Sequence, residues 1–133
     1  MDVEKLKGDK KNPIKDVFNK FKYSFAGMAH CFKNETSFIF ETIAMVLIIL
    51  FGIIFKISFM EWIFSVLSML LIMEVEFLNT AIEATVDMVT KEYHPLAKIA
   101  KDCGSAATCM ATFMALIVNL IIFVPRLLEL IIK

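Results

Sequence analysis

Three long runs of apolar residues fill the second part of the chain, and short polar segments separate them. Residues 36–55 could cross about 30 Å of hydrocarbon as a helix that rises about 1.5 Å per residue. A polar break at residues 56–58 precedes the second run, about 59–84, and the polar loop 88–102 precedes the third. The third run, 103–125, contains no charged side chain. The pattern therefore predicts an all-α integral membrane protein with three transmembrane helices.

A fourth helix is predicted ahead of these runs, over residues 13–34, because Pro13 suits the first turn of a helix. Apolar residues recur there at spacings of three and four, so they form one stripe, and the lysines fall elsewhere on the helix. Since membrane spans follow, we favour an amphipathic helix in the membrane interface over a core-facing helix of a soluble bundle. The polar leader, residues 1–12, is expected to be frayed or disordered. The stripe consists of Ile14, Val17, Phe18, Phe21, Phe25, Met28 and Phe32.

Composition and charge agree with this interpretation. Hydrophobic residues make up 59% of the 133 residues, whereas a soluble domain is usually nearer half apolar, and the length suits one domain. The three cysteines have no zinc-binding spacing and are interpreted as small apolar side chains. Lysines outnumber acids in residues 1–33, and three lysines lie in the loop 88–102, but only one lies in the break 56–58. Positive-inside bias therefore predicts that the N-terminus and the loop are cytoplasmic.

Acidic side chains interrupt the second apolar run and share one face of its predicted helix. With Glu76 at zero and about 100° per residue, Asn79 falls at about 300° and Glu83 at about 340°. Asp87 falls at about 20°, whereas Glu74 falls at about 160°, nearly opposite, and is left out of the cluster. A charged side chain at mid-bilayer costs on the order of 3 kcal/mol, so several on one face predict a partner: cations, lysines or a metal.

Magnesium suits such a face, because it is bound by carboxylate oxygens together with water and phosphate oxygens. We favour a functional role for Glu76 and Glu83, whereas structural pairing or a helix end outside the lipid explains Asp87 equally well. The four glycines form no phosphate-binding loop, and no HExxH or zinc-ligand cluster is present. Any bound phosphate must therefore be held by lysines and a carboxylate-bound metal. Lys101 and Asp102, at the entry to the third run, lie at the depth where the second run leaves the membrane.

Three stretches of the chain resemble a known family. These are EFLNTAIEATVD (76–87), EYHPLAKIAKD (92–102) and GSAA (104–107), and the likeness begins at YSFAGMAHCFKNE (23–35) and extends over about residues 23–125. The pattern E-x-x-N-[ST]-A-I-E-x-x-x-D followed by A-K-x-x-K-D is highly specific. It resembles the small prokaryotic membrane lipid kinases, the diacylglycerol kinases and undecaprenol kinases of bacterial membranes.

The resemblance implies a fold and an activity. The family is a homotrimer of subunits with three transmembrane helices and an N-terminal surface helix, and neighbouring subunits share an active site. It transfers the γ-phosphate of ATP, with Mg²⁺, to the primary hydroxyl of a membrane lipid. We therefore expect a lipid kinase in the bacterial cytoplasmic membrane that binds ATP and a lipid alcohol, and no nucleic acid.

The resemblance also implies roles for individual residues. Glu76 matches the general base, which also contacts the substrate, and Asn79 matches a residue that orients the site. Glu35 and Glu83 match the residues that hold Mg²⁺ on ATP, and Ser105 matches a residue beside the lipid headgroup. Lys101 would also add positive charge to the transferred group. The positions that match nucleotide contacts are Tyr23, Glu92, Tyr93, His94, Lys101 and Asp102.

The lipid acceptor is the harder choice. HPLAKIAKD, the ending LIIFVPRLL and the lysine-rich leader look like the undecaprenol kinases of Gram-positive bacteria, whereas GSAA at residues 104–107 looks more like the diacylglycerol kinases. We favour undecaprenol, with diacylglycerol as the alternative, and both lipids could be accepted. Glu74 departs from the apolar residue usual at its position, and the role of Glu41 is open. A small proton-coupled exporter and a non-catalytic assembly protein are remote alternatives.

Overall fold

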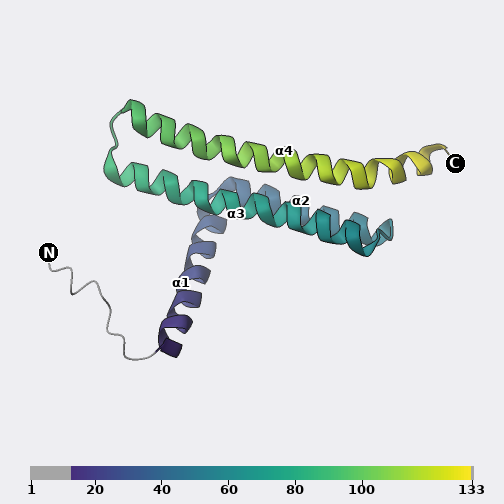
Figure 1. Cartoon of the computed structure of the whole chain (residues 1–133), viewed down its shortest axis with the longest axis horizontal. Coiled ribbons are helices and arrows are strands. Elements are labelled where there is room, and N and C mark those ends of the chain that lie inside the picture. The colour runs from purple at the N-terminus through teal and green to yellow at the C-terminus, as the bar shows by residue number, and fades with distance from the viewer. Residues whose placement is uncertain (1–12, 133) are drawn as a thin grey trace. The chain divides into compact units, whose positions relative to one another are not determined.

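The computed structural model describes residues 13–132, and all regular structure within them is helical. The predicted all-α architecture is therefore confirmed for this part of the chain, and the polar leader 1–12 lies outside it. By residue contacts, α1 belongs to one unit and the chain from Glu35 onward forms a second. The helices are α1 (Pro13–Asn34), α2 (Thr36–Ile54), α3 (Phe59–Val89) and α4 (Pro95–Ile132), coloured along the chain in Figure 1.

Helix α1 is amphipathic, as its spacing predicts. The aromatic side chains of its apolar stripe are largely exposed, among them Phe18 at 71% and Phe25 at 65%. Asp16 lies in its first turn and Lys33 in its last, where each charge complements the helix dipole. The helix thus has an apolar face available for a membrane surface and a cationic face available for lipid headgroups.

Each of α2, α3 and α4 is long and apolar enough to cross a membrane, so the prediction of three membrane-capable helices is confirmed. They contain 19, 31 and 38 residues. At about 1.5 Å per residue, α2 matches a hydrocarbon layer of about 30 Å, whereas α3 and α4 reach about 46 and 57 Å. The two longer helices therefore tilt or extend beyond the hydrocarbon, and polar side chains can lie at its edge.

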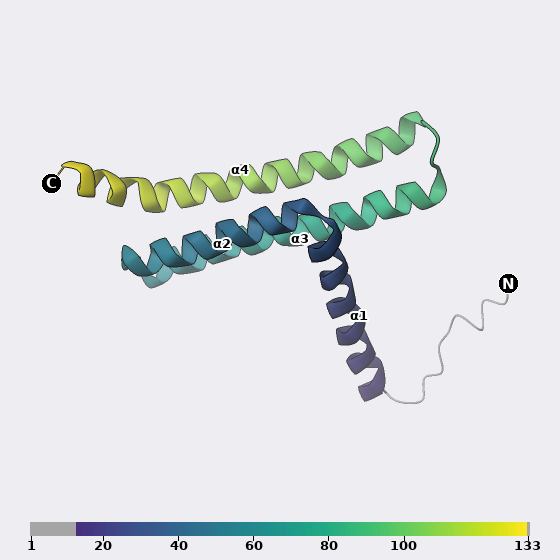
Figure 2. The same ribbon diagram turned by 180° about the vertical axis from the view of Figure 1, so that it is seen from behind.

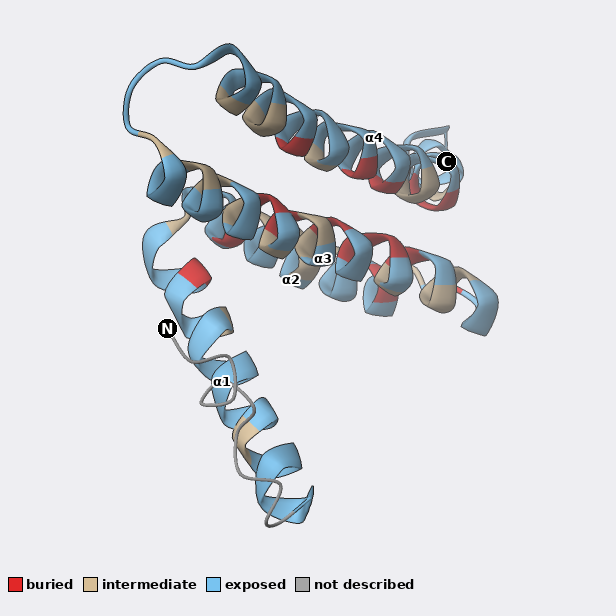
Figure 3. Ribbon diagram, turned by 60° about the vertical axis from the view of Figure 1, so that its left-hand side comes forward, coloured by how far each residue is buried: buried red, intermediate tan, exposed pale blue. Residues whose placement is uncertain are grey.

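Helices α3 and α4 pack as an antiparallel pair, and α2 packs against α3 (Figures 1 and 2). Figure 3 shows that buried positions of α3 and α4 lie on the sides that face each other. The central contact consists of Met69 and Ile72 from α3 with Ala111 and Ala115 from α4. Small alanine side chains let two membrane helices approach closely, and long ones fill the remaining space.

Polar contacts fix α3 and α4 along their length. The Ser65 hydroxyl, which is fully buried, donates a hydrogen bond to Asn119 Oδ1, and Asn119 Nδ2 donates to Ser68 Oγ at 3.3 Å. Nearer the α2–α3 turn, Arg126 Nη2 donates to Glu61 Oε2 at 2.8 Å. Because each pair joins specific positions on the two helices, together they set the register of the hairpin.

The start of α3 is determined locally. Glu61 N donates to Ser58 Oγ at 3.4 Å, and Ser58 N donates to Glu61 Oε2 at 2.7 Å, which completes a capping box. Lys56 adopts a left-handed backbone with φ 49° in the turn that precedes this cap. Residues 56–58 therefore form the tight connection that the break in the apolar pattern predicts, with the apolar Ile57 side chain buried.

Candidate functional site

The predicted acidic face of α3 turns toward α4 at the end of the hairpin near the α3–α4 loop. Glu76 and Asn79 are each only 8% exposed, Glu83 is half-buried and Asp87 is exposed. Burial thus falls along the face as α3 approaches the loop. Glu74, on the other side of α3, is exposed.

Asn79 links Glu83 to helix α4. Its Nδ2 donates a hydrogen bond to Glu83 Oε1 at 3.1 Å, one helical turn further along. Its Oδ1 is buried without a hydrogen-bond partner and lies against Gly104 of α4. The amide is therefore held between a carboxylate on its own helix and a glycine on the facing helix.

Two ion pairs lie beyond this contact. Lys101 Nζ of α4 donates to Asp87 Oδ1 of α3 at 2.6 Å, and Lys98 pairs with Asp102 one turn apart on α4. The sequence placed Lys101, Asp102 and the acids of α3 at one depth, and the structure brings Lys101 to Asp87. Both pairs are substantially exposed, so each can be exchanged for another charged partner at little cost.

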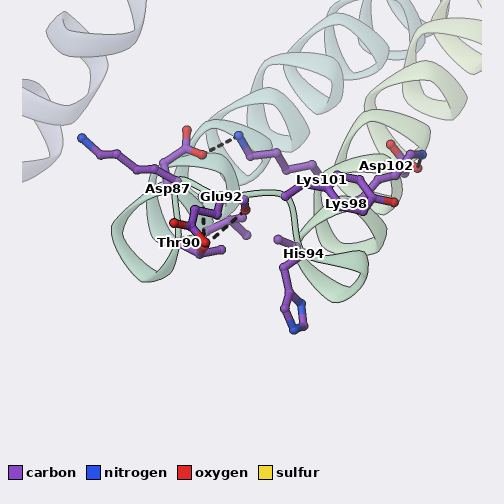
Figure 4. Close-up of a pocket in the computed structure, with 11 residues that line it drawn as sticks. Asp87, Thr90, Glu92, His94, Lys98, Lys101 and Asp102 are labelled. Carbon is purple, nitrogen blue, oxygen red and sulfur yellow. Dashed lines mark hydrogen bonds and ion pairs between the residues drawn. The ribbon is translucent and has the colours of Figure 1, made fainter.

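A cavity of about 410 Å³ lies beside these ion pairs (Figure 4). Thr90 Oγ1 accepts a hydrogen bond from Glu92 N at 3.1 Å, which shapes the loop at the cavity wall. His94 Nδ1 accepts from Leu96 N at 3.2 Å, and the ring points away from the Asp87–Lys101 pair in the figure. The predicted nucleotide-contact residues that line the cavity are Glu92, Tyr93, His94, Lys101 and Asp102, and Lys91 and Lys98 line it with them.

The remaining predicted site residues are not among those that line this cavity. Glu35 precedes α2 and makes no capping hydrogen bond with its side chain. Tyr23 is exposed on α1, and Ser105 is exposed on α4 next to Gly104. Among residues 13–132, no three His, Cys, Asp or Glu side chains gather as a metal-binding cluster. A metal at Glu35 or Glu83 would therefore need further oxygen ligands, such as those of a phosphate or water.

A second cavity, of about 520 Å³, contains Glu76 in its wall. Glu41 of α2 and Thr108 and Thr112 of α4 line the same cavity, so it lies where α2 and α4 flank α3. A more apolar cavity of about 280 Å³ shares Glu41 and Thr112 and extends to Asn119. Carboxylates and hydroxyls therefore line part of a groove whose other lining residues are mostly apolar, an arrangement that suits a lipid with a polar end.

Sequence reasoning left two of these residues without a role. Glu41 had a visible signal, because a charge inside an apolar span is a functional candidate by default, but no pattern showed that it shares a cavity with Glu76. Gly104 had no signal beyond its place in the GSAA stretch. Its contact with Asn79 depends on which turn of α4 faces α3, and helical spacing within one segment does not determine that.

Comparison with known proteins gives the relatives of this chain. Residues 22–123 match the sequence model of a family described as prokaryotic diacylglycerol kinase. The undecaprenol kinase of Bacillus subtilis (strain 168) is 34% identical over 90% of this chain and 97% of its own length. The diacylglycerol kinase of Escherichia coli (strain K12) is 38% identical over 71% of this chain and 78% of its own. The diacylglycerol kinase of Pseudomonas aeruginosa is 41% identical over 74% of this chain and 80% of its own length.

Proposed function

This chain belongs to the prokaryotic diacylglycerol kinase family and is a membrane lipid kinase, and we propose that its main acceptor is undecaprenol, with diacylglycerol as the alternative. One observation carries the choice of acceptor. The undecaprenol kinase aligns with 90% of this chain and 97% of its own length, whereas the diacylglycerol kinases described above align with less of both chains. The product would be undecaprenyl phosphate, formed with ATP as the phosphate donor.

Glu76 is proposed as the general base. It is buried, it lines the cavity of about 520 Å³, and an apolar groove adjoins that cavity. A lipid alcohol could enter along the groove without leaving the hydrocarbon and bring its hydroxyl to the carboxylate. Glu76 would then accept the hydroxyl proton as the oxygen bonds to phosphorus. Ser105, exposed on α4 about one turn before the cavity-lining Thr108, is proposed to contact the lipid headgroup.

The nucleotide is proposed to bind at the cavity of about 410 Å³ near the α3–α4 loop. Lys91, Lys98 and Lys101 line that cavity and supply positive charge for phosphate oxygens. Lys101 would exchange Asp87 for phosphate, and Lys98 would release Asp102 in the same way. Phosphoryl transfer depends chiefly on positioning and on neutralising charge, and a loop lysine together with two lysines one turn apart on α4 suits both requirements. Tyr23, Glu92, Tyr93, His94 and Asp102 are the further proposed nucleotide contacts.

Glu83 and Glu35 are the proposed ligands for Mg²⁺. The half-buried Glu83 carboxylate accepts a hydrogen bond on Oε1 from Asn79, and carboxylate oxygens of this kind are ligands that Mg²⁺ prefers. The Glu35 side chain is free of a capping role. Both side chains are carboxylates, the ligand type that suits this ion, which would neutralise phosphate charge when bound. Asn79 would hold Glu83 in place.

A homotrimer in the bacterial cytoplasmic membrane, with cytoplasmic N-termini, completes the proposal. The groove beside Glu76 is open within one protomer, and most large apolar side chains of α2 and α4 are exposed. A neighbouring subunit would cover part of that surface and enclose a site that three helices alone leave open. The lysines of α1 would then meet anionic lipid headgroups on the cytoplasmic side.

The test is a direct comparison of the two lipids. The purified protein in detergent micelles should release ADP from ATP only when Mg²⁺ and a lipid alcohol are present, and faster with undecaprenol than with diacylglycerol at equal mole fraction. A clear preference for diacylglycerol would reverse the choice of acceptor. ATP turnover that neither lipid stimulates, together with a response to a proton gradient, would favour the exporter instead.

A further inference from the structure

Gly104 of α4 lies directly against the amide of Asn79 on α3. A Cβ added to this buried glycine would overlap Asn79 Oδ1 and lie 3.3 Å from its Cγ and 3.9 Å from its Cα. Because of the overlap with Oδ1, the methyl group of an alanine could fit only if the amide moved.

The amide of Asn79 has one favourable orientation in this position. As it stands, Nδ2 donates to Glu83 Oε1 at 3.1 Å, and Oδ1 occupies the space that a side chain at residue 104 would fill. With the amide rotated by 180°, Oδ1 would face the Glu83 carboxylate, and acceptor would meet acceptor. The orientation that lets Nδ2 donate to Glu83 therefore leaves Oδ1 buried without a hydrogen-bond partner.

We propose that Gly104 is a positioning residue for the phosphoryl-transfer site: it admits the Asn79 amide, which in turn fixes the Glu83 carboxylate. The inference rests on the proposed function, in which Glu83 binds the metal of the nucleotide. With Oε1 held by Asn79, the carboxylate keeps one orientation, and Oε2 stays available to a cation. Groups that orient a metal-binding carboxylate through a hydrogen bond typically change metal affinity about 10- to 100-fold when removed.

Gly52 provides a matched control in the same chain. It is also buried in a helix, and an added Cβ would lie 2.5 Å from Trp62 Cη2 and 2.7 Å from Cζ2. Trp62 lies 17 residues before Asn79 on α3, which is about 26 Å at about 1.5 Å per residue. Alanine is a better helix former than glycine, so neither substitution weakens its own helix. The two variants therefore share a steric conflict between helices and differ in whether Asn79 is involved.

The experiment measures cation binding directly. Mn²⁺ is titrated into the full-length protein in micelles with a non-hydrolysable ATP analogue, and free Mn²⁺ is followed by electron paramagnetic resonance. Thermal unfolding and the Mg²⁺ dependence of kinase activity are recorded for the same samples. The variants are Gly104→Ala, Gly52→Ala, Asn79→Ala, Gly104→Ala with Asn79→Ala, and Glu83→Gln as the reference for a lost ligand.

Gly104→Ala should weaken Mn²⁺ binding about tenfold and raise the half-saturating Mg²⁺ concentration by a similar factor. Asn79→Ala should do the same, and the double variant should be no worse than either single variant. Gly52→Ala should lower the unfolding temperature without changing Mn²⁺ affinity. If Gly104→Ala does not fold, the double variant, from which the clashing amide is absent, should fold.

Three results would overturn the inference. The first is an Mn²⁺ affinity of the Gly104→Ala variant equal to that of the unmodified protein or of Gly52→Ala. Another is additive losses in the double variant, because independent effects on Mn²⁺ affinity would mean that Gly104 does not act through Asn79. The third is unchanged Mn²⁺ affinity in Glu83→Gln, which would remove the proposed metal role itself. The first two leave that role standing, so the two failures are distinguishable.

Discussion

The two ends of the α3–α4 hairpin use polar residues differently. We call the end near residues 56–58 the turn end and the end near the α3–α4 loop the loop end. At the turn end, the polar contacts between the helices are closed pairs, such as Glu61 with Arg126 and Ser65 with Asn119. At the loop end, Asn79 has a buried oxygen without a partner, Glu76 faces a cavity, and the ion pairs are exposed.

Under the proposed assignment of the site, this difference would separate stability from chemistry within one hairpin. Satisfied polar pairs in a membrane stabilise the contact between helices and specify register. Groups that must exchange partners during a reaction have to be left partly unsatisfied or paired only at the surface, and this is the arrangement at the loop end. We therefore expect substitutions at the turn end to change unfolding and substitutions at the loop end to change turnover.

The largest expected effect is at Glu76. Glu76→Gln keeps the shape of the side chain but removes the base, so turnover should fall roughly 100- to 10,000-fold while nucleotide binding persists. Initial rates of ADP release and binding of a fluorescent ATP analogue measure the two quantities. Glu74→Gln is the matched control, two residues away and exposed, and should retain activity. Equal losses in both variants would contradict the base assignment.

A smaller effect is expected at the turn end. Ser65→Ala removes the hydroxyl that donates to Asn119 Oδ1, and leaves that half-buried amide without this donor. Hydrogen bonds between membrane helices contribute about 0.6 kcal/mol on average and up to about 1.7 kcal/mol, so we expect a loss of about 1 kcal/mol in the free energy of unfolding. Denaturation in mixed micelles measures it. A fall in turnover per folded protein, with stability unchanged, would erase the distinction between the two ends.

The smallest effect is expected at Asp87. Asp87→Asn releases Lys101 from its ion pair, so the lysine should meet nucleotide phosphate more readily and the KM for ATP should fall about two- to fivefold. Titration of initial rate against ATP at fixed lipid gives this value, and the effect should shrink as salt is added. A large rise in KM would instead show that Asp87 holds Lys101 in its working position.

The sequence was informative where the signal is local. Apolar runs predicted α2, α3 and α4 as membrane-capable helices, and the Ser58–Glu61 spacing is itself a capping signal. The period of a helix also placed Asn79 and Glu83 on one face, where the structure joins them by a hydrogen bond. In each case, the relevant residues lie within a few helical turns of one another.

Contacts between helices were beyond this reasoning. That Lys101 pairs with Asp87, that Glu41 shares a cavity with Glu76 and that Gly104 meets Asn79 all depend on the offset between neighbouring helices. That offset is set by side-chain packing over the whole hairpin, including the Ala111 and Ala115 contact, and no single segment determines it. The roles of the site residues rest on the family resemblance and on the experiments above.

The lengths of α3 and α4 have a consequence for the lipid environment. Since both helices exceed the thickness of a bilayer, the plane at which oil gives way to water is not fixed by where they end. A thinner membrane would bring that plane closer to Glu76, and a thicker one would draw it toward the loop. Changing the acyl-chain length of reconstituted vesicles should therefore shift the depth of the water boundary relative to the lipid hydroxyl, with the protein sequence unchanged.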